Sequence, residues 1–327
     1  MIDPKIIAAQ IPLVLLEAEF PELPNHYKGK VRENYDLPDG KRILISTDRQ
    51  SAFDKVLAAV PFKGQVLTQT AKFWFEKTAD ICPNHALEYP DPNVVIARRL
   101  KMLPVEIIVR DYLTGSTDTS VWTAYSKGNR EFCGNKLPEG LKKNDKLPEV
   151  ILTPSTKPTD GTHDISVVPS FLVENDLVSQ KQWDELASIS LKLFARGQAI
   201  AAQNGLILVD TKYEFGVDEN NMITLADEIH TPDSSRYWKA DSYEARHAAG
   251  EEPESLDKEF LRLWIRTKCD PYNEQIPAIP EDVLVEFSQK YINLFETVTG
   301  QEFQLPDLTV SVKERIKHNL LKYFPQT

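Results

Sequence analysis

Residues 206–229 constrain the fold more than any other stretch of this chain. Two runs rich in apolar and β-branched residues are separated by the polar run Asp218–Asn221, a pattern that predicts a β-hairpin. Side chains alternate between the two faces of a strand. Asp210, Lys212 and Glu214 therefore share one face of the first strand. The hairpin is expected to present a charged surface on that face and an apolar one on the other.

The same hairpin predicts a metal site. A turn centred between Asn220 and Asn221 places Glu214 directly opposite Asp227. Two facing carboxylates repel each other unless a cation lies between them. Mg²⁺ binds one or two carboxylates together with phosphate oxygens, so this pair suits it. The alternative is an ordinary solvated face that happens to be charged.

Three other segments combine cations with small or hydroxyl residues, as anion-binding sites do. Residues 231–236 follow the hairpin and end in Arg236, whose guanidinium could hold a phosphate or carboxylate through two hydrogen bonds. A predicted strand ends near Arg110, and Ser116 is expected to open a helix whose N-terminus favours an anion. Gly29–Arg32 places two cations on another predicted strand. Each pattern is also compatible with an ordinary strand or turn.

Composition and motif content exclude several classes of protein. A length of 327 residues predicts about two domains, and a net charge of −11 argues against a protein that coats nucleic acid. No apolar run approaches the length of a membrane-spanning helix. The three cysteines show no paired spacing, which favours a reducing compartment, and the cytoplasm is the expected location. The phosphate-loop, dinucleotide, serine-hydrolase and zinc-protease motifs are absent from the sequence.

The order of elements predicts an α+β protein of two lobes, because strand pairs come first and strands mixed with long helices follow. Residues 1–103 are expected to form the first lobe and residues 104–327 the second. Residues 128–165 are interpreted as a long excursion over the surface. A capping box at Ser179 predicts the start of a helix that ends before Gly205. The other predicted elements are strands at 28–37, 41–47, 93–100 and 105–113, and helices at 6–16, 65–80, 116–126, 257–268, 281–296 and 310–323.

Taken in this order, the segments resemble one family, the SAICAR synthetases (phosphoribosylaminoimidazole-succinocarboxamide synthases) of purine biosynthesis. The similarity runs from about residue 28 to 265. It is carried by the motifs Ser46–Asp54, Leu103–Ser116, Leu208–Gly216 and Asp227–Trp238. The chain departs from the family pattern at Glu33, Asn34 and Gln50. Its residues 128–165, which contain Thr153–Lys157, are similar to those of the longer members.

The resemblance implies a reaction, a fold and a set of partners. ATP, 5-amino-1-(5-phosphoribosyl)imidazole-4-carboxylate and L-aspartate would become the succinocarboxamide SAICAR, ADP and phosphate. The implied fold is SAICAR-synthetase-like, with a kinase-like antiparallel N-terminal lobe, an ATP-grasp-like C-terminal lobe and ATP between them. ATP and Mg²⁺ are the expected cofactors and small molecules the expected partners, with no nucleic acid and no membrane. The long insert favours a monomer.

The resemblance also implies roles for individual residues. Lys212 is expected nearest the reacting carboxylate or the aspartate, and Asp210 could orient either Lys212 or the incoming amine. The expected catalytic residues are Lys212, Asp210 and Arg236, and the expected metal ligands are Glu214 and Asp227. The expected ATP-binding residues are Gly29, Lys30, Arg32, Lys101, Met102 and Glu106. The expected substrate-binding residues are Arg110, Ser116, Asp233, Ser235, Arg236 and Arg262.

Two other functions are compatible with parts of this pattern. A kinase-type phosphotransferase would share the hairpin lobe and the metal carboxylates, but the His-Arg-Asp catalytic loop and the Asp-Phe-Gly triplet are absent from the sequence. A non-catalytic nucleotide sensor would be expected to lose metal or phosphate ligands. In this chain Glu214, Asp227, Lys30 and Arg236 are all present.

Overall fold

The computed structural model describes residues 2–53, 55–117, 119–157 and 164–324, and the chain forms two compact units. The first unit contains residues 1–73, 85–99 and 260–327, and the second contains residues 74–84 and 100–259. The division at residue 103 expected from the sequence places the whole C-terminal part in the second lobe. In the structure the last segment instead joins the first unit, because its helices bury apolar faces against the N-terminal residues.

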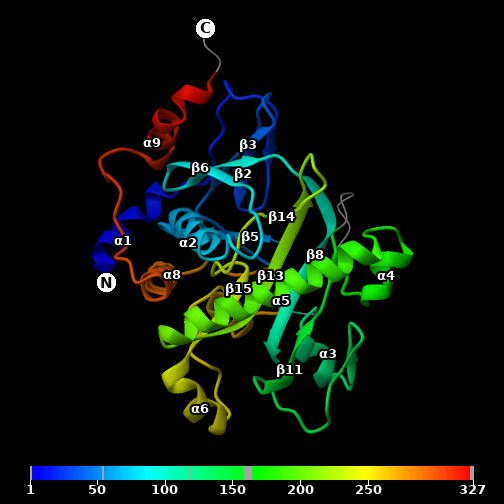
Figure 1. Ribbon diagram of the computed structural model, residues 1–327. Helices are drawn as coiled ribbons and strands as arrows, with labels where there is room; N and C mark the ends of the chain where they lie inside the picture. Colours follow the sequence, from blue (N-terminus) through cyan, green and yellow to red (C-terminus); the bar gives the residue numbers. More distant parts are fainter. Residues whose placement is uncertain (1, 54, 118, 158–163, 325–327) are drawn as a thin grey trace. The chain divides into compact units, whose positions relative to one another are not determined.

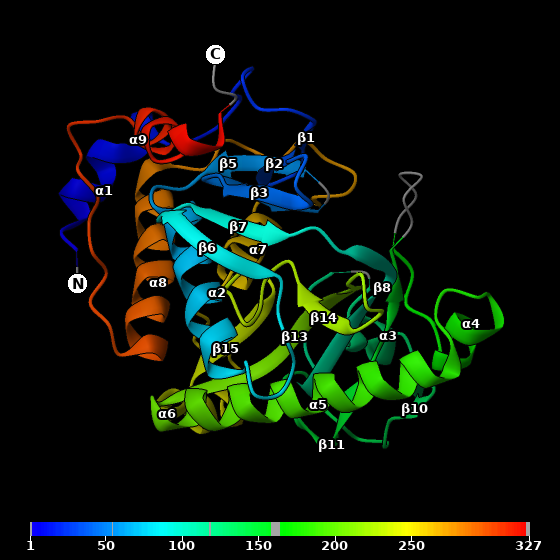
Figure 2. The same ribbon diagram turned by 45° about the horizontal axis from the view of Figure 1, so that its top comes forward.

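The first unit contains a five-stranded antiparallel sheet. Its order is β1 (His26–Lys28), β2 (Arg32–Asp36), β3 (Lys41–Ser46), β7 (Val94–Arg98) and β6 (Ala86–Asp91) (Figure 1 and Figure 2). The predicted hairpin between β2 and β3 is confirmed, and its turn contains Gly40 at a φ of 77°. The predicted strand at 28–37 is wrong in one respect. A tight turn at Gly29–Arg32 divides it, so that residues 26–28 form a separate strand.

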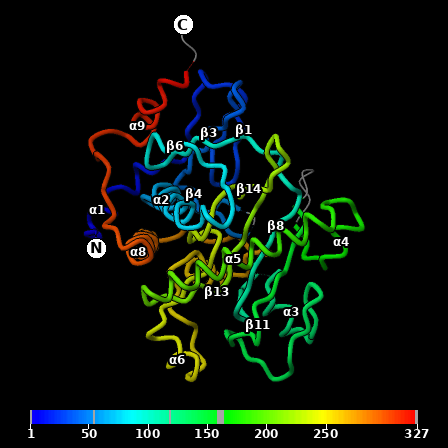
Figure 3. The backbone as a smooth tube through the Cα atoms, in the orientation of Figure 1, coloured from blue at the N-terminus to red at the C-terminus, as the bar shows by residue number. Residues whose placement is uncertain are grey.

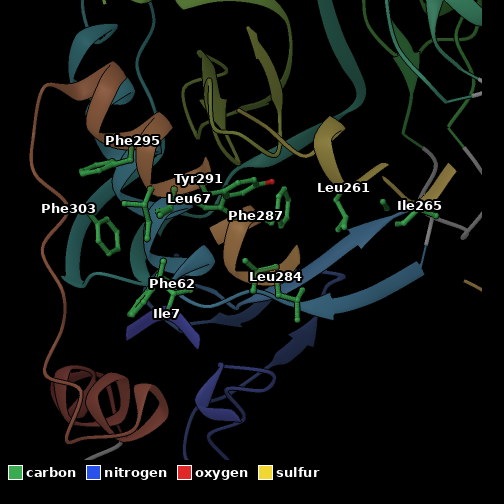
Figure 4. Close-up of a cluster of buried hydrophobic side chains, with 14 of the residues drawn as sticks. Ile7, Phe62, Leu67, Leu261, Ile265, Leu284, Phe287, Tyr291, Phe295 and Phe303 are labelled. Carbon is green, nitrogen blue, oxygen red and sulfur yellow. The ribbon is translucent and has the colours of Figure 1, made fainter. Parts of the chain in front are cut away.

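Helices and a small hairpin complete the first unit. They are α1 (Pro4–Gln10), β4 (Arg49–Ala52), β5 (Lys55–Ala59), α2 (Lys63–Lys77, which continues into the second unit), α7 (Glu259–Arg266, whose first residue belongs to the second unit), α8 (Glu281–Thr299) and α9 (Val312–Asn319), with short 3-10 turns at Ile11–Leu13 and Leu321–Tyr323. Phe287, Tyr291 and Phe295 recur at helical spacing, so α8 presents one apolar face. Figure 4 shows this face against Ile7 of α1 and Leu67 of α2.

The C-terminal segment returns to the N-terminal one within the first unit. Figure 3 shows the orange-red segment between α8 and α9 passing beside the blue α1, and Ile316 and Leu320 are buried in one cluster with Leu15. An ion pair joins α9 to β6. The Arg315 Nε lies 2.9 Å from Oδ2 of Asp91, a carboxylate with no solvent-exposed surface. This segment is therefore part of the first unit's core.

The second unit is built on a six-stranded antiparallel sheet. Its strands are β8 (Lys101–Tyr112), β11 (Lys146–Leu152), β12 (Ser155–Thr156), β13 (Leu206–Val217), β14 (Ile223–Ala226) and β15 (Ser235–Lys239), and β9 (Glu131–Phe132) with β10 (Asn135–Lys136) forms a separate hairpin. Its helices are α3 (Val121–Ser126), α4 (Pro169–Glu174), α5 (Gln180–Gln203) and α6 (Ala240–Ala248). The predicted capping box of α5 is confirmed, and α5 crosses β13 and β8 (Figure 2). No helix among the described residues is long and apolar enough to span a membrane.

Residues 128–165 are not the surface excursion that their composition predicted. Two of their segments, β11 and β12, pair with β8, and Ser155 lies opposite Glu106. Leu147 and Ile151 are buried in a small core with residues of α3. Alternating apolar residues therefore complete the sheet at this edge. Residues 158–163 of this segment lie outside the described residues, as do Asp54 and Asp118.

The register of the β13–β14 hairpin differs by one residue from the prediction. Glu214 lies opposite Ala226, and Asp227 follows the end of β14 at a φ of 60°. The reason is the turn. The Asp218 carboxylate accepts hydrogen bonds from the N–H groups of Asn220 and Met222, which closes a turn centred on Asn220 itself.

A buried histidine between β14 and β15, which contacts Tyr213 of β13, should make the fold sensitive to acid. His230 has no exposed surface, its Nε2 shares a 2.5 Å hydrogen bond with the Tyr213 hydroxyl, and burial lowers its pKa to about 3. An unfolded histidine binds a proton below a pKa of about 6.5. The stabilising contribution is therefore complete above that pH and is lost as the pH falls toward 3.

We predict that this residue alone lowers the free energy of unfolding by about 2 kcal/mol between pH 7 and pH 5. Urea unfolding at both pH values should show a smaller loss in His230→Gln, because glutamine does not titrate. Equal losses in the two proteins would contradict the assignment.

Candidate functional site

The candidate site lies on one face of the strand pair β8–β13. Arg110 lies opposite Asp210, and Glu106 lies opposite Glu214. Both β8 residues and both β13 residues are separated by four positions, so all four side chains share one face of the sheet. This register produces two charged groups. The carboxylate–lysine cluster consists of Glu106, Lys157, Lys212, Glu214 and Asp227, and the arginine cluster consists of Arg110, Asp210 and Arg236.

Lys212 is the centre of the carboxylate–lysine cluster. Its Nζ lies 3.0 Å from Oε1 of Glu106 and 3.7 Å from Oδ2 of Asp227, and it also contacts Glu214 Oε1. Lys157 contacts the other oxygen of Glu214 and lies 3.5 Å from Glu106 Oε1. Three carboxylates thus surround two ammonium groups, which leaves an excess negative charge when all are ionised.

The ionisation of this cluster follows from burial and from neighbouring charges. Burial opposes the charge on Lys212, but Glu106 and Glu214 outweigh it and raise the lysine pKa well above its ordinary value. Burial likewise opposes the charge on Glu106, yet Lys212 and Lys157 hold its pKa below the ordinary value. Lys212 is therefore a permanent cation in the ligand-free protein, and its charge is compensated by the carboxylates.

The donor chemistry of this cluster fits a hard divalent cation. Oxygens from three carboxylates converge on one position that a cation, the Lys212 ammonium, already occupies. The described residues contain no group of three or more His, Cys, Asp or Glu side chains arranged to hold a metal ion. Mg²⁺ typically takes only one or two carboxylates and keeps water or phosphate oxygens, so the pair Glu214 and Asp227 would be enough protein ligands for it.

In the arginine cluster one carboxylate holds two guanidinium groups. Oδ2 of Asp210 accepts hydrogen bonds from Nη1 of Arg236 at 2.5 Å and from Nη1 of Arg110 at 3.3 Å. Arg110 also donates to Thr153 Oγ1, and Arg236 donates to Glu259 Oε2. The side chains of Arg110 and Arg236 are only 8% and 11% exposed. Burial, together with the charge of Arg236, lowers the pKa of Arg110 although Asp210 opposes this. Asp210 is thus shared by two guanidinium groups, and Arg236 has a second carboxylate partner in Glu259.

The turn after β8 lies beside this cluster. Gly115 has a φ of 111°, and a Cβ at this position would lie 3.0 Å from Nη2 of Arg236. The Ser116 hydroxyl is buried and has no hydrogen-bond partner within the described structure. Ser116 does not open a helix as predicted, because α3 begins at Val121 after Ser120 has capped it. A buried hydroxyl without a partner, next to a glycine that lies close to Arg236, is consistent with a site for an anion.

The remaining predicted site residues are distributed over both units. Ser235 bonds Thr211 through its hydroxyl at 2.7 Å, and Asp233 is buried in the turn before β15. Lys101 and Met102 are exposed at the start of β8. Four more residues belong to the first unit: Gly29, Lys30 and Arg32 in the turn before β2, and Arg262 in α7.

Sequence reasoning missed two participants, Thr153 and Lys157. Thr153 accepts a hydrogen bond from Arg110, and Lys157 pairs with Glu214. Both come from Thr153-Pro-Ser-Thr-Lys157, a segment noted for its family resemblance but given no role. Its signal was a lysine and three hydroxyls in five residues, directly after a β-rich run. The structure places this segment along β8, where it meets both clusters.

We predict that Asp210→Asn destabilises the ligand-free protein by about 3 kcal/mol or more, because two buried guanidinium groups lose their shared carboxylate. Inorganic phosphate should then raise the melting temperature of the variant more than that of the unchanged protein. Thermal unfolding with and without phosphate measures both effects. An identical response to phosphate in the two proteins would show that the cluster does not hold anions.

Comparison with known proteins assigns the chain to a family. The family model described as SAICAR synthetase matches residues 25–279. An Agrobacterium fabrum protein with a provisional phosphoribosylaminoimidazole-succinocarboxamide synthase name is 58% identical over 95% of this chain and 99% of its own length. The Saccharomyces cerevisiae SAICAR synthase in complex with SAICAR is 33% identical with a TM-score of 0.76, over 89% of this chain and all of that one. A SAICAR synthetase in complex with ADP is 26% identical with a TM-score of 0.66, over 86% of this chain and all of that one.

These matches confirm the predicted α+β fold class, since the similar structures cover most of the chain. They also confirm the resemblance that the four sequence motifs indicated, because the matched residues include all of them. The chain therefore belongs to the SAICAR synthetase family.

Proposed function

We propose that this chain joins L-aspartate to the carboxylate of 5-amino-1-(5-phosphoribosyl)imidazole-4-carboxylate, with conversion of ATP to ADP and phosphate. As a member of its family the chain is an ATP-dependent ligase of purine biosynthesis. One observation supports roles for individual residues. The β8–β13 register places a carboxylate–lysine cluster and an arginine cluster on the same sheet face. The first suits a metal–triphosphate group and the second an anionic substrate.

The chemistry requires both kinds of group. A carboxylate is a poor electrophile at neutral pH. Transfer of the γ-phosphoryl group of ATP to the substrate carboxylate forms an O–P bond and releases ADP. The aspartate amine then attacks the acyl carbon, a C–N bond forms, the C–O bond to phosphate breaks and the amine loses a proton. Phosphoryl transfer depends mainly on positioning and on charge stabilisation, which cations around the phosphates provide.

We assign the carboxylate–lysine cluster to the ATP end of the reaction. Glu214 and Asp227 would hold Mg²⁺, which when bound offsets the negative charge of the phosphates. Lys212, already fixed by these carboxylates, would contact the transferring phosphoryl group or the reacting carboxylate. The proposed ATP contacts are Gly29, Lys30, Arg32, Lys101, Met102 and Glu106. The shared cluster supports the role of Glu106, and the other five assignments rest on the family resemblance.

We assign the arginine cluster to the imidazole nucleotide. Arg110 and Arg236 would bind its phosphate or carboxylate, with Ser116 as an added hydroxyl donor. Asp210 would position the two guanidinium groups, since its Oδ2 accepts from both. Asp233, Ser235 and Arg262 are proposed as further substrate contacts. A monomeric state and a cytoplasmic location are proposed on sequence grounds alone.

ADP release measured with each substrate omitted in turn tests the function. The ligase requires both aspartate and the imidazole carboxylate, so omission of either should abolish ADP release. ADP formation without aspartate and without the imidazole carboxylate would instead favour a phosphotransferase. Absence of ADP under every condition would favour a nucleotide sensor.

Replacement of one proposed metal ligand tests the magnesium site. Asp227→Asn should raise the Mg²⁺ concentration for half-maximal activity at least about tenfold, because one charged oxygen ligand becomes a neutral one. Glu219→Gln removes the same charge from an exposed position on the same hairpin and should change this concentration little. Equal magnesium dependence in the two variants would contradict the assignment of Asp227.

A further inference from the structure

One family motif, Ser46–Asp54, has no role in the site described so far. In the first unit it follows β3 and forms β4, and its last residue lies outside the described structure. Thr47 and Arg49 of this motif face the turn Gly29–Arg32 between β1 and β2. This is the turn that carries Lys30, which is proposed to contact the ATP phosphates. The contacts between motif and turn therefore bear on how ATP is bound.

Thr47 and Arg49 bind every carbonyl oxygen of the turn. Arg49 donates from Nε to the carbonyl of Lys30 at 3.0 Å, and from Nη2 to those of Gly29 at 2.9 Å and Arg32 at 3.2 Å. Thr47 donates to the carbonyl of residue 31 from its backbone N–H at 3.0 Å and from its hydroxyl at 2.7 Å. The turn closes on itself through the N–H of Gly29 and the carbonyl of Arg32 at 2.8 Å. All four carbonyls consequently point into the motif.

The guanidinium of Arg49 is fully engaged. Its Nη1 donates to Glu33 Oε1 at 2.5 Å and to the carbonyl of Leu16 at 2.5 Å, so five acceptors match the five N–H groups of an arginine. Its side chain is 6% exposed, and that of Glu33 is not exposed at all. The other Glu33 oxygen lies 2.9 Å from Nε2 of His26. Arg49 thus has a structural counter-ion and no remaining donor for a ligand.

We propose that Arg49 is a positioning residue that shapes the Gly29–Arg32 turn for the phosphates of ATP. The inference rests on the proposed function, because it takes Lys30 and Arg32 to be ATP contacts. A carbonyl oxygen directed at a phosphate repels it, so a backbone turn that binds phosphates must direct its carbonyls elsewhere. Arg49 and Thr47 achieve this before ATP arrives, which removes the cost of ordering the turn during binding.

The test compares Arg49→Lys with a matched control. Lysine keeps the charge beside Glu33 but lacks the planar fork of donors, so it cannot hold three carbonyls. The KM for ATP should rise at least about tenfold, while the KM values for the imidazole nucleotide and aspartate stay within about twofold. Amide hydrogen exchange at residues 29–32 should become faster.

The control is Arg315→Lys, which alters another largely buried arginine of the same unit, 14% exposed and paired with Asp91. It should lower the melting temperature without changing the KM for ATP.

Several outcomes would overturn the proposal. An equal rise in all three KM values, or a loss of stability with the KM for ATP unchanged, would show that Arg49 is merely structural. If Arg49→Lys does not fold, Glu33→Gln tests the proposal in its place. This variant removes only the charge that fixes the guanidinium, so it should also raise the KM for ATP selectively. An unchanged KM for ATP in Glu33→Gln would then reject the proposal, as would an unchanged KM for ATP in Lys30→Ala.

Failure of the proposed function has a different signature. The unchanged protein would then release ADP without aspartate, or not at all. A selective weakening of ADP binding by Arg49→Lys, measured by titration calorimetry, would still support the role of Arg49 in that case. Equal ADP affinity in the unchanged protein and the variant would reject it, whichever reaction the protein performs.

Discussion

The pairing of β8 with β13 is the constraint on which the candidate site depends. The register that places Arg110 opposite Asp210 also places Glu106 opposite Glu214. A shift by one residue would turn every one of these side chains to the other face, among the apolar residues of the core. Two buried strands of twelve residues each therefore fix the separation of the two charged clusters. Precision at the site comes from backbone hydrogen bonds rather than from flexible loops.

Burial of so many charges is costly unless each is compensated. The structure meets this requirement within each cluster, since Asp210 is shared by two arginines and Lys212 by three carboxylates. The carboxylate–lysine cluster has three carboxylates and two ammonium groups, whereas in the arginine cluster Asp210 and Glu259 together pair with two guanidinium groups. Both clusters lie on one face of the β8–β13 pair, so basic side chains are concentrated locally in a chain whose net charge is −11.

Features set by neighbouring residues could be predicted from the sequence. The charged face of β13 follows from strand alternation. The capping box of α5 depends on one local pair of hydrogen bonds, and the Gly40 turn on one backbone dihedral. The family motifs identified the chain for a related reason, because each motif is a continuous run. The sequence by itself thus determined the α+β class, the family and most of the residues proposed for the site.

The tertiary structure decided what depends on residues distant in the chain. It returned residues 260–327 to the first unit, added β11 and β12 to the sheet and brought Lys157 to Glu214. No local pattern encodes these outcomes, because they follow from which apolar faces and which strand edges are available for burial and pairing. The position of Glu214 opposite Ala226 is the smallest example. The Asp218 carboxylate moved the centre of the turn, and this shifted the register by one residue from the predicted one.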